Sequence, residues 1–359
     1  MDDLVATVAL FRGKRVLLTG DTGFKGSWLA LWLAGAGAEV YGYALPAERE
    51  DDHFNLLCLR DRITHHDGDI RDHAELGAFF QSAQPEFVFH LAAQALVRRS
   101  YRDPKETLDT NIGGSVNLLE CVRETPSVKS LVYITSDKCY RNKEWIWGYR
   151  ENDELGGHDP YSASKAAAEL VLSAYGNSFF QSRPGFGYAS VRAGNVIGGG
   201  DWSDDRIVPD CLRALRNSEP IVLRKPQSTR PWQHVLEPLG GYMALAASLA
   251  RDPARFSGAW NFGPDGEATQ TVHALAQKII ERWGSGKIEI RGAVSDPHEA
   301  GLLHLNCDKA RHVLGWRPRW GFDATVSKTV DWYRAVLAGE PAVKVSNKQI
   351  ECYMEKVDD

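Results

Sequence analysis

The sequence predicts an α/β protein with a Rossmann-like, doubly wound parallel sheet and a second, smaller lobe of mixed α/β structure. Short β-rich runs alternate with helical runs through the first half of the chain, a pattern typical of a parallel sheet covered on both faces. A glycine-rich loop joins the first strand to an apolar helix, as it does in dinucleotide-binding folds. Beyond residue 195 the pattern becomes irregular and rich in Pro, Gly and Trp, which indicates the second lobe.

Each element follows from a local run of residues. In chain order we expect a strand at Arg15–Thr19, a helix at Gly26–Gly35, strands at Glu39–Ala44 and Phe87–Leu91, a helix around Asn111–Val122, and strands at Ser130–Ile134 and Ser190–Ala193. Two later helices, near Val272–Trp283 and Ala324–Leu337, are expected in the smaller lobe. Strands that alternate with helices at this pace form βαβ units, so the strands of the first half should lie parallel.

The domain boundaries are less simple than one cut. Residues 1–190 are predicted to form the first domain, and residues 191–340 mainly the second lobe. Trp260–Gly263 has the composition of a late strand that returns to the first domain, so a returning segment is expected near residues 230–265. Residues 341–359 are predicted to be a polar, loosely held tail.

The composition excludes several classes of protein. A chain with 43% hydrophobic residues, 25% charged residues and a net charge of −5 is not a general binder of nucleic acid, which needs a basic face. The apolar run Trp28–Ala34 is too short to cross a membrane, and no signal peptide is visible. The six cysteines form no C-x-x-C pair and indicate a reducing compartment. We therefore expect a cytoplasmic protein.

The glycine loop predicts a site for a phosphate group. Gly20, Gly23 and Gly26 follow the first strand and open a helix, where small residues let the backbone approach a pyrophosphate and free N–H groups meet it. The spacing is G-x-x-G-x-x-G, and a plain strand–turn–helix is the alternative. The second strand ends without a carboxylate, so the loop does not decide between NAD and NADP. Asp69, after a short third strand, is either a hydrogen-bond partner of adenine or a turn residue.

A second group of residues predicts acid–base chemistry. Tyr161 and Lys165 lie one helical turn apart, so the ammonium group should favour the phenolate and lower the pKa of the phenol. Ser136 ends a strand and can hydrogen-bond the same reacting oxygen. Asp137 and Lys138 follow it as two further proton carriers, or as a surface salt bridge. Catalytic groups favour strand ends in open α/β folds.

These residues carry a resemblance. Through Thr19–Gly26, His90–Gln94, Asn111 and Tyr161–Lys165, the chain resembles the extended short-chain dehydrogenase/reductase family over nearly its full length. Within that family it is similar to the nucleotide-sugar 4,6-dehydratases, above all the branch that acts on CDP-glucose. The segments that carry this narrower resemblance are residues 19–28, 135–140, 156–162, 193–202 and 230–235. Lys138 stands where the branch that acts on dTDP-glucose has Glu.

The resemblance implies an activity and a cofactor. It implies that CDP-D-glucose is converted to CDP-4-dehydro-6-deoxy-D-glucose and water by oxidation at C4, elimination across C5–C6 and hydride return to C6. Tyr161 would act as base at the 4-hydroxyl, Asp137 as acid and Lys138 as base for the elimination. The implied cofactor is NAD, held by Gly20, Thr22, Gly23, Phe24, Lys25, Gly26, Asp69, Ile70, Leu91, Ala92, Tyr161 and Lys165.

The second lobe then becomes a nucleotide-sugar-binding lobe. The resemblance places Asn195 at the diphosphate or sugar, and Arg230, His298 and Glu299 at the nucleotide end. Arg206 is either a diphosphate contact or an ordinary ion pair. No metal is expected, because His298-Glu299 is not followed by a second His at position 302. The family pairs its protomers through the helices that bear Asn111 and Tyr161, which implies a homodimer or homotetramer.

Two rival functions share many of these residues. A nucleotide-sugar 4-epimerase would have the same fold and the same Ser–Tyr–Lys set, but it needs no acid and base for C5 and C6. A non-catalytic, NAD(P)-sensing interaction protein would keep the fold but would be expected to lose Tyr161 or Lys165. Both residues are present, so the dehydratase is the favoured prediction.

Overall fold

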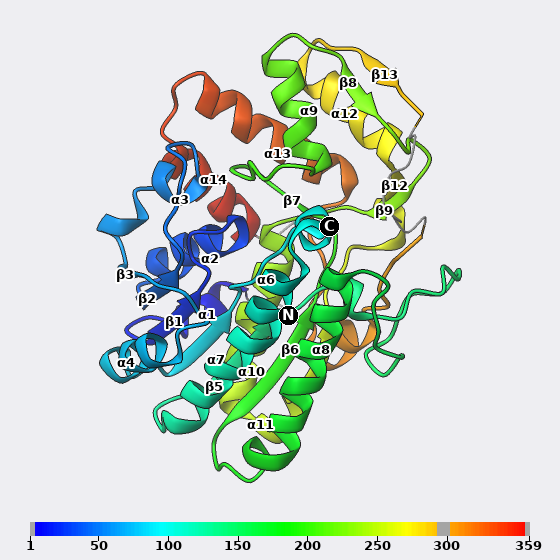
Figure 1. Ribbon diagram of the computed structural model, residues 1–359. Helices are drawn as coiled ribbons and strands as arrows, with labels where there is room; N and C mark the ends of the chain where they lie inside the picture. Colours follow the sequence, from blue (N-terminus) through cyan, green and yellow to red (C-terminus); the bar gives the residue numbers. More distant parts are fainter. Residues whose placement is uncertain (1–3, 293–301, 356–359) are drawn as a thin grey trace.

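Seven parallel strands form the main sheet of the computed structural model, which describes residues 4–292 and 302–355 (Figure 1). The strand order is β11-β6-β5-β4-β1-β2-β3. After β1, the chain adds β2 and β3 on one side of it. The chain then crosses over and adds β4, β5, β6 and β11 on the other side of β1. The carboxyl ends of β1 and β4 therefore flank a switch point, where ligands bind in folds of this kind. The bounds are β1 Arg15–Thr19, β2 Glu39–Ala44, β3 Thr64–Asp67, β4 Phe87–His90, β5 Ser130–Ile134, β6 Gly187–Arg192 and β11 Gly258–Asn261.

Helices cover both faces of the sheet because its strands are apolar on both sides. Val16 and Leu18 of β1 belong to the core cluster that includes helices α2 (Phe24–Gly35) and α10 (Leu236–Arg251). Leu17 points to the other face and belongs to the core cluster of helices α4 (His73–Ala83), α7 (Gly114–Glu124) and α8 (Pro160–Tyr175). The predicted doubly wound, Rossmann-like sheet is thus confirmed.

Several segments of the chain after β6 build the smaller lobe from short strands and long helices (Figure 1). Three strand pairs occur there: β7 (Val196–Ile197) with β10 (Gln233–His234), β8 (Ile221–Leu223) with β13 (Ile288–Ile290), and β9 (Thr229–Pro231) with β12 (Thr269–Thr271). The long helices are α9 Ile207–Arg216, α12 Val272–Trp283 and α13 Phe322–Leu337. Strand β11 leaves this lobe and pairs with β6. The division of the chain into domains stays a prediction.

Short helices connect these elements. They are α1 Leu4–Ala9, α3 His53–Leu56, α5 Val97–Arg102, α6 Pro104–Leu108 and α11 Pro253–Phe256, the 3₁₀ turns Leu59–Asp61, Asp137–Cys139 and Gly266–Ala268, and the π turns Asp109–Gly113, Gly176–Phe180 and Ala310–Leu314. The π turn at Asp109–Gly113 lies at the start of the predicted helix around Asn111. Such turns often occur at functional sites.

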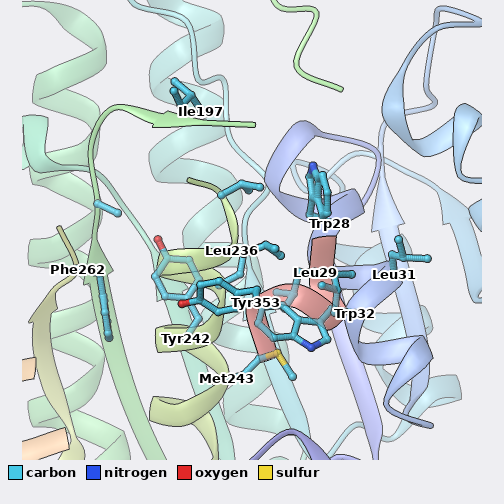
Figure 2. Close-up of a cluster of buried hydrophobic side chains, with 14 of the residues drawn as sticks. Trp28, Leu29, Leu31, Trp32, Ile197, Leu236, Tyr242, Met243, Phe262 and Tyr353 are labelled. Atoms are coloured by element: carbon cyan, nitrogen blue, oxygen red, sulfur yellow. The ribbon is translucent and has the colours of Figure 1, made fainter. Parts of the chain in front are cut away.

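The predicted loose tail is wrong for most of its length. Residues Ala342–Met354 form helix α14, which lies between α2 and α10 (Figure 2). Tyr353 is buried there against Trp32, with their rings edge to face. Its hydroxyl donates to Glu237 of α10 at 2.8 Å. The polar composition of the tail concealed an apolar face that includes Ile350 and Tyr353.

Candidate active site

The glycine loop after β1 has the shape of a phosphate cradle. Gly20 has a φ of +78°, and a Cβ there would lie 2.6 Å from the Ala92 nitrogen, so only glycine fits. A Cβ on Gly26 would lie 2.0 Å from the Gly20 oxygen, which shows how tightly the loop packs. Gly23 caps α2 without a side-chain hydrogen bond, so the first N–H groups of the helix are left for an anion. These residues fit the pyrophosphate of a dinucleotide.

Residues at the end of β4 lie directly against this loop. The Leu91 N–H donates to the Thr19 carbonyl at 3.0 Å, and the Ala92 N–H donates to the Thr19 hydroxyl at 3.3 Å. Phe24 packs against the core from the first turn of α2. The structure thus brings together the glycine loop, Phe24, Leu91 and Ala92, as predicted for a shared cofactor site.

Two loop side chains have further contacts. The Thr22 hydroxyl donates to the backbone carbonyl of Leu45 at 2.9 Å and so ties the loop to the end of β2. Burial, followed by the charges of Arg206 and Lys165, lowers the pKa of Lys25 to about 8, while Asp137 raises it. Lys25 therefore lies within the electrostatic reach of the predicted catalytic residues.

Asp69 has the contacts of a turn residue. Its carboxylate accepts hydrogen bonds from the Arg71 side chain and from the Arg71 N–H at 2.9 Å, and the hydrogen bond to Arg71 lowers its pKa. Ile70 is buried, and a Cβ on Gly114 would lie 2.6 Å from its side chain. Both residues lie beyond β3, on the adenine side of the switch point. Their contact with adenine stays a prediction.

The sequence missed a carboxylate beside β2. Asp21 of the glycine loop is buried and hydrogen-bonds His65 Nδ1 at 2.6 Å. A Cβ on Gly42 of β2 would lie 2.2 Å from its carboxylate. The loop therefore places an acid where the strand itself carries none. The pairing of Gly42 with His65 across β2 and β3 could not be read from residues this far apart.

Ser136, Tyr161 and Lys165 converge at the carboxyl end of β5. Ser136 follows β5 and caps the turn Asp137–Cys139, and its hydroxyl is near enough to Tyr161 to influence the pKa of the phenol. Tyr161 and Lys165 lie on α8 and are buried. The start of α8 is fixed by Asp159, whose side chain accepts from the Ser162 N–H at 2.9 Å.

A network of amides holds α8 in place. The Asn111 side chain donates to the Ser164 hydroxyl at 2.8 Å and to the Gln94 carbonyl at 3.0 Å. The Gln94 N–H donates back to the Asn111 side chain at 2.8 Å. Asn111 thus links the segment after β4 to the helix between Tyr161 and Lys165, which gives the motif residue its structural role.

The pKa of the Tyr161 phenol shifts in the direction opposite to the one expected from its spacing to Lys165. Burial raises the pKa of Tyr161 to about 12, although the nearby Ser136 hydroxyl lowers it. Burial also lowers the pKa of Lys165 to about 8. The expected lowering of the Tyr161 pKa by Lys165 is therefore not found, because burial is the largest influence on the phenol.

Asp137 is buried beside these residues, and Lys138 borders it. Asp137 Oδ1 accepts from the Ser136 hydroxyl at 2.9 Å, and Oδ2 is buried with no hydrogen-bond partner among the described residues. Lys138 Nζ lies 3.9 Å from Asp137 Oδ1 with 37% of its side chain exposed. A Cβ on Gly194 would lie 1.9 Å from the Asp137 carboxylate. A buried acid and a half-exposed amine are thus placed next to Ser136, unlike a surface salt bridge.

The substrate residues predicted in the second lobe lie at the same edge, as far as the structure describes them. Asn195 has a φ of +51°, and its buried Nδ2 has no hydrogen-bond partner within the described chain. Arg206 Nη1 lies 2.8 Å from Asp201 Oδ2, and the charge of Asp201 raises its pKa. Arg230 is buried in β9 and donates to the Thr229 carbonyl at 2.8 Å. His298 and Glu299 lie outside the described residues.

Arg192 of β6 carries a guanidinium that does not face that edge. It is 3% exposed and pairs with Glu169 at 2.8 Å. Glu169 also accepts from the hydroxyls of Thr135 and Ser190. Glu169 is a residue that sequence reasoning missed. Its spacing of four from Lys165 and eight from Tyr161 is the signal that could have found it.

A cavity of about 200 Å³ opens beside Asp137. It is lined by Asp137, Gly148, Gly194, Pro231, Gln233, Gly263, Pro264, Gly266, Thr269, His304, Leu305, Asn306, Cys307, Asp308 and Arg311. The cavity joins the ends of β5, β6 and β11 to the smaller lobe. In residues 4–292 and 302–355, no cluster of His, Cys, Asp and Glu could hold a metal ion, and no helix could span a membrane.

Comparisons with known proteins agree on one group. A family model described as GDP-mannose 4,6 dehydratase matches residues 17–329. CDP-glucose 4,6-dehydratase of Salmonella typhimurium is 50% identical over 348 residues, which cover 96% of this chain and 97% of the relative. Half of all positions are thus shared along almost the whole length of both chains.

Solved structures show the same fold. Epimerase Mth375 of Methanothermobacter thermautotrophicus superposes with a TM-score of 0.80 at 24% identity, covering 96% of this chain and 97% of that one. UDP-glucose 4-epimerase of Thermus thermophilus, solved in complex with NAD, has a TM-score of 0.74 at 27% identity and covers 89% of this chain and 99% of its own. Dehydratases and epimerases therefore share this architecture, and the site has to distinguish them.

Proposed function

We propose the activity of this protein from its family, because the chain belongs to the GDP-mannose 4,6 dehydratase family of extended short-chain dehydrogenases/reductases. The resemblance read from its motifs is thereby confirmed. The protein is a hydro-lyase that converts CDP-D-glucose to CDP-4-dehydro-6-deoxy-D-glucose and water. The 50% identity to a CDP-glucose 4,6-dehydratase over nearly the full length of both chains carries this conclusion.

NAD is the cofactor, as in the related epimerase that was solved with it. When bound, NAD supplies the oxidant that takes hydride from C4 of the sugar and returns it to C6. The free N–H groups at the start of α2 would hold its pyrophosphate. Lys165, which is buried beside Ser136 and Tyr161, would orient the ribose next to the reacting centre.

The side chains at the end of β5 divide the proton transfers. Tyr161 takes the proton of the 4-hydroxyl, and Ser136 hydrogen-bonds the same oxygen. The C4 ketone makes the C5 hydrogen acidic, so that Lys138 can remove it while Asp137 protonates the departing 6-hydroxyl. The burial of Asp137 and its distance of 3.9 Å from Lys138 support this division.

The grip on the nucleotide sugar comes from the smaller lobe. We assign Asn195 and Arg206 to the diphosphate or sugar, since a buried amide without a partner and a guanidinium lie at this edge. Arg230 is assigned to the nucleotide end, together with His298 and Glu299. Replacing Arg230 with Ala should raise KM for CDP-glucose at least ~10-fold, the effect of losing a charged hydrogen bond.

A panel of substrates tests the function. The purified protein, supplied with NAD, is incubated with CDP-glucose, dTDP-glucose and UDP-glucose, and the products are identified by mass and sugar configuration. A dehydratase yields a product lighter by one water, fastest from CDP-glucose. Unchanged mass with inverted C4 would indicate the epimerase, and no product would indicate a non-catalytic NAD(P) sensor. The epimerase is the weaker alternative because it has no use for Asp137 and Lys138.

Assembly and location complete the proposal. We propose a homodimer or homotetramer paired through α7 and α8, the pairing that the family resemblance implies. All six cysteines are free thiols, which supports a reducing, cytoplasmic location. Light scattering of the purified protein would measure the assembly, and a monomer at micromolar concentration would contradict it.

A further inference from the structure

His53 is a buried histidine that the proposed chemistry does not use. It begins the short helix α3, is 2% exposed, and contacts one serine through each ring nitrogen. Nδ1 lies 2.8 Å from Ser27 Oγ, and Nε2 lies 3.3 Å from Ser346 Oγ. Ser27 belongs to the first turn of helix α2, and Ser346 belongs to the C-terminal helix α14. The ring thus joins two helices from opposite ends of the chain.

The hydrogen bonds of the two serines determine which ring nitrogen carries the proton. The Ser27 hydroxyl donates to the Phe24 carbonyl at 3.0 Å, so its oxygen can only accept from His53. Nδ1 therefore carries the proton, and Nε2 accepts from the Ser346 hydroxyl. Trp332 of α13 in turn donates to Ser346 Oγ at 2.8 Å. Burial lowers the pKa of His53 to about 3, which keeps the ring neutral, with one donor and one acceptor.

Three neighbours prevent the ring from turning. The ring centroids of Trp28 and Trp332 lie 5.0 Å and 5.3 Å from that of His53. A Cβ on Gly200 would lie 2.4 Å from His53 Cδ2, and Gly200 has a φ of +81°, so the backbone of the loop before Arg206 lies directly against the ring. The two nitrogens therefore stay directed at their serines.

The bond to Ser27 acts on the part of α2 that would hold NAD. The Ser27 N–H donates to the Gly23 carbonyl at 2.9 Å, and its hydroxyl closes the same turn through Phe24. A Cβ on Gly26, the residue before it, would lie 2.0 Å from the Gly20 oxygen. A shift of Ser27 would therefore move the backbone of the phosphate cradle. Free N–H groups bind a pyrophosphate best when they are in place before it arrives.

We propose that His53 is a positioning residue for the cofactor: its Nδ1–H holds Ser27, and with it the phosphate-binding turn of α2, while α14 holds its Nε2. The inference rests on the proposed function, in which this turn binds NAD. Helix α14 packs against both α2 and α3, so the segment that the sequence classed as a loose tail becomes part of the support of the cofactor site.

Two substitutions separate the two ring nitrogens. In His53→Asn an amide N–H can take the place of Nδ1–H, whereas the longer side chain in His53→Gln brings its amide to the place of Nε2. Both remove the ring, so each controls for the packing lost in the other. Calorimetric titration of the full-length protein with NAD measures the affinity. The Kd should rise about 10-fold in His53→Gln, because the ligand must then order the turn itself, and His53→Asn should recover most of this loss.

The turnover number should separate positioning from chemistry. At saturating NAD, kcat for CDP-glucose should change far less than the Kd for NAD in both variants, because His53 takes part in no proton transfer. Ser346→Ala should weaken NAD binding by a smaller factor than His53→Gln does, since the bond to Ser27 remains. Unchanged NAD affinity in Ser346→Ala would remove α14 from the support of the cofactor site.

Ser27→Ala leaves the ring in place and tests the same bond if the exchanges at His53 unfold the protein, which thermal unfolding would reveal. It should weaken NAD binding as His53→Gln does, and when it is combined with His53→Asn or with His53→Gln the two double variants should bind NAD equally. Equal affinities of the two single variants at His53 would overturn the proposal, as would wild-type affinity in Ser27→Ala. A wild type that binds NAD but forms no dehydrated product would refute only the proposed reaction.

Discussion

Two neighbouring residues of one strand end lead to two different buried carboxylates. Thr135 donates to Glu169 on α8, and Ser136 donates to Asp137 in the following turn. Glu169 accepts hydrogen bonds from three further donors, whereas one oxygen of Asp137 has no partner among the described residues. Successive residues at the end of β5 point to opposite sides. We call the side of Thr135 and Glu169 the fixed layer, because its hydrogen bonds are satisfied, and the side of Ser136 and Asp137 the reactive edge.

The two buried carboxylates differ in the cation that lies beside each of them. Burial opposes the charge of Glu169, but the hydrogen bonds and charge of Arg192 outweigh it and lower the pKa of the carboxyl. Asp137 is as deeply buried, but its nearest cation is Lys138 at 3.9 Å with 37% of that side chain exposed. A paired and saturated carboxylate holds helix α8 against β5 and β6. An incompletely satisfied one can exchange a proton.

The largest effect is expected at the reactive edge, from Tyr161→Phe. Loss of the phenol that takes the 4-hydroxyl proton should lower kcat by about 10⁴-fold, the upper range for a general base. Turnover of CDP-glucose, measured by product mass, checks the prediction, with thermal unfolding as a control for the fold. Turnover above a tenth of the wild-type rate would remove Tyr161 from the chemistry.

In the fixed layer, Glu169→Gln should lower the free energy of unfolding by about 3–5 kcal/mol, because Arg192 is left buried without its counter-charge. Denaturant unfolding measures this loss. The matched control is Glu154→Gln, which breaks an exposed ion pair with Arg141 and should cost far less, because water solvates both groups. If both variants lose the same free energy of unfolding, the buried pair of Glu169 stabilises the fold no more than a surface ion pair does.

Asp137→Asn sharpens the comparison from the other side. It should lower the rate of dehydration by about 10²–10³-fold and reduce the free energy of unfolding much less than Glu169→Gln does, because Lys138, its neighbouring cation, is 37% exposed and stays solvated. The reduced cofactor should still form, because oxidation at C4 precedes the step that needs the acid. A variant that loses stability as Glu169→Gln does would make Asp137 a structural residue.

The strands of the sheet and the residues at their ends could be predicted from the sequence, because regular strands and helices repeat at a known period. β1, β2 and β5 begin and end where the apolar runs predicted, and Tyr161 and Lys165 follow from helical spacing alone. Glu169 obeys the same spacing, but its partners Thr135 and Ser190 come from two other strands. The pairing of Arg192 with Glu169 was missed for the same reason, since nothing in its own segment shows that Glu169 faces it.

The smaller lobe and the tail were harder to predict. Asn195 and Arg230 lie beside or on strands of two or three residues, which leave no periodic pattern. Arg206 precedes helix α9 at the end of an irregular segment. The pKa of Tyr161 depends on the burial of the whole edge, and spacing to Lys165 cannot supply that. Helix α14 packs through Tyr353 and Ile350 onto residues hundreds of positions earlier, so composition alone classed it as loose.

A third buried carboxylate, that of Glu237, shows what burial does to the pKa of a carboxyl group that is not paired as Glu169 is. Glu237 accepts from the N–H groups of Arg319 and Trp320 and from the Tyr353 hydroxyl, and burial raises its pKa from 4.5 to about 7. Its folded pKa lies above its unfolded one, so its contribution to stability is complete below the unfolded pKa and is lost as pH rises through the folded pKa.

The free energy of unfolding of the wild type, relative to Glu237→Gln, should therefore fall by about 3 kcal/mol as the pH rises from 4.5 to 7. Denaturant unfolding of both proteins at several pH values measures the difference, in which all other titrating groups cancel. Glu169→Gln should show the opposite sign, because the paired carboxyl has a lowered pKa and stabilises the fold only when it is ionised. If both differences run in the same direction with pH, the guanidinium is not what distinguishes the two carboxylates, and burial alone sets their charge.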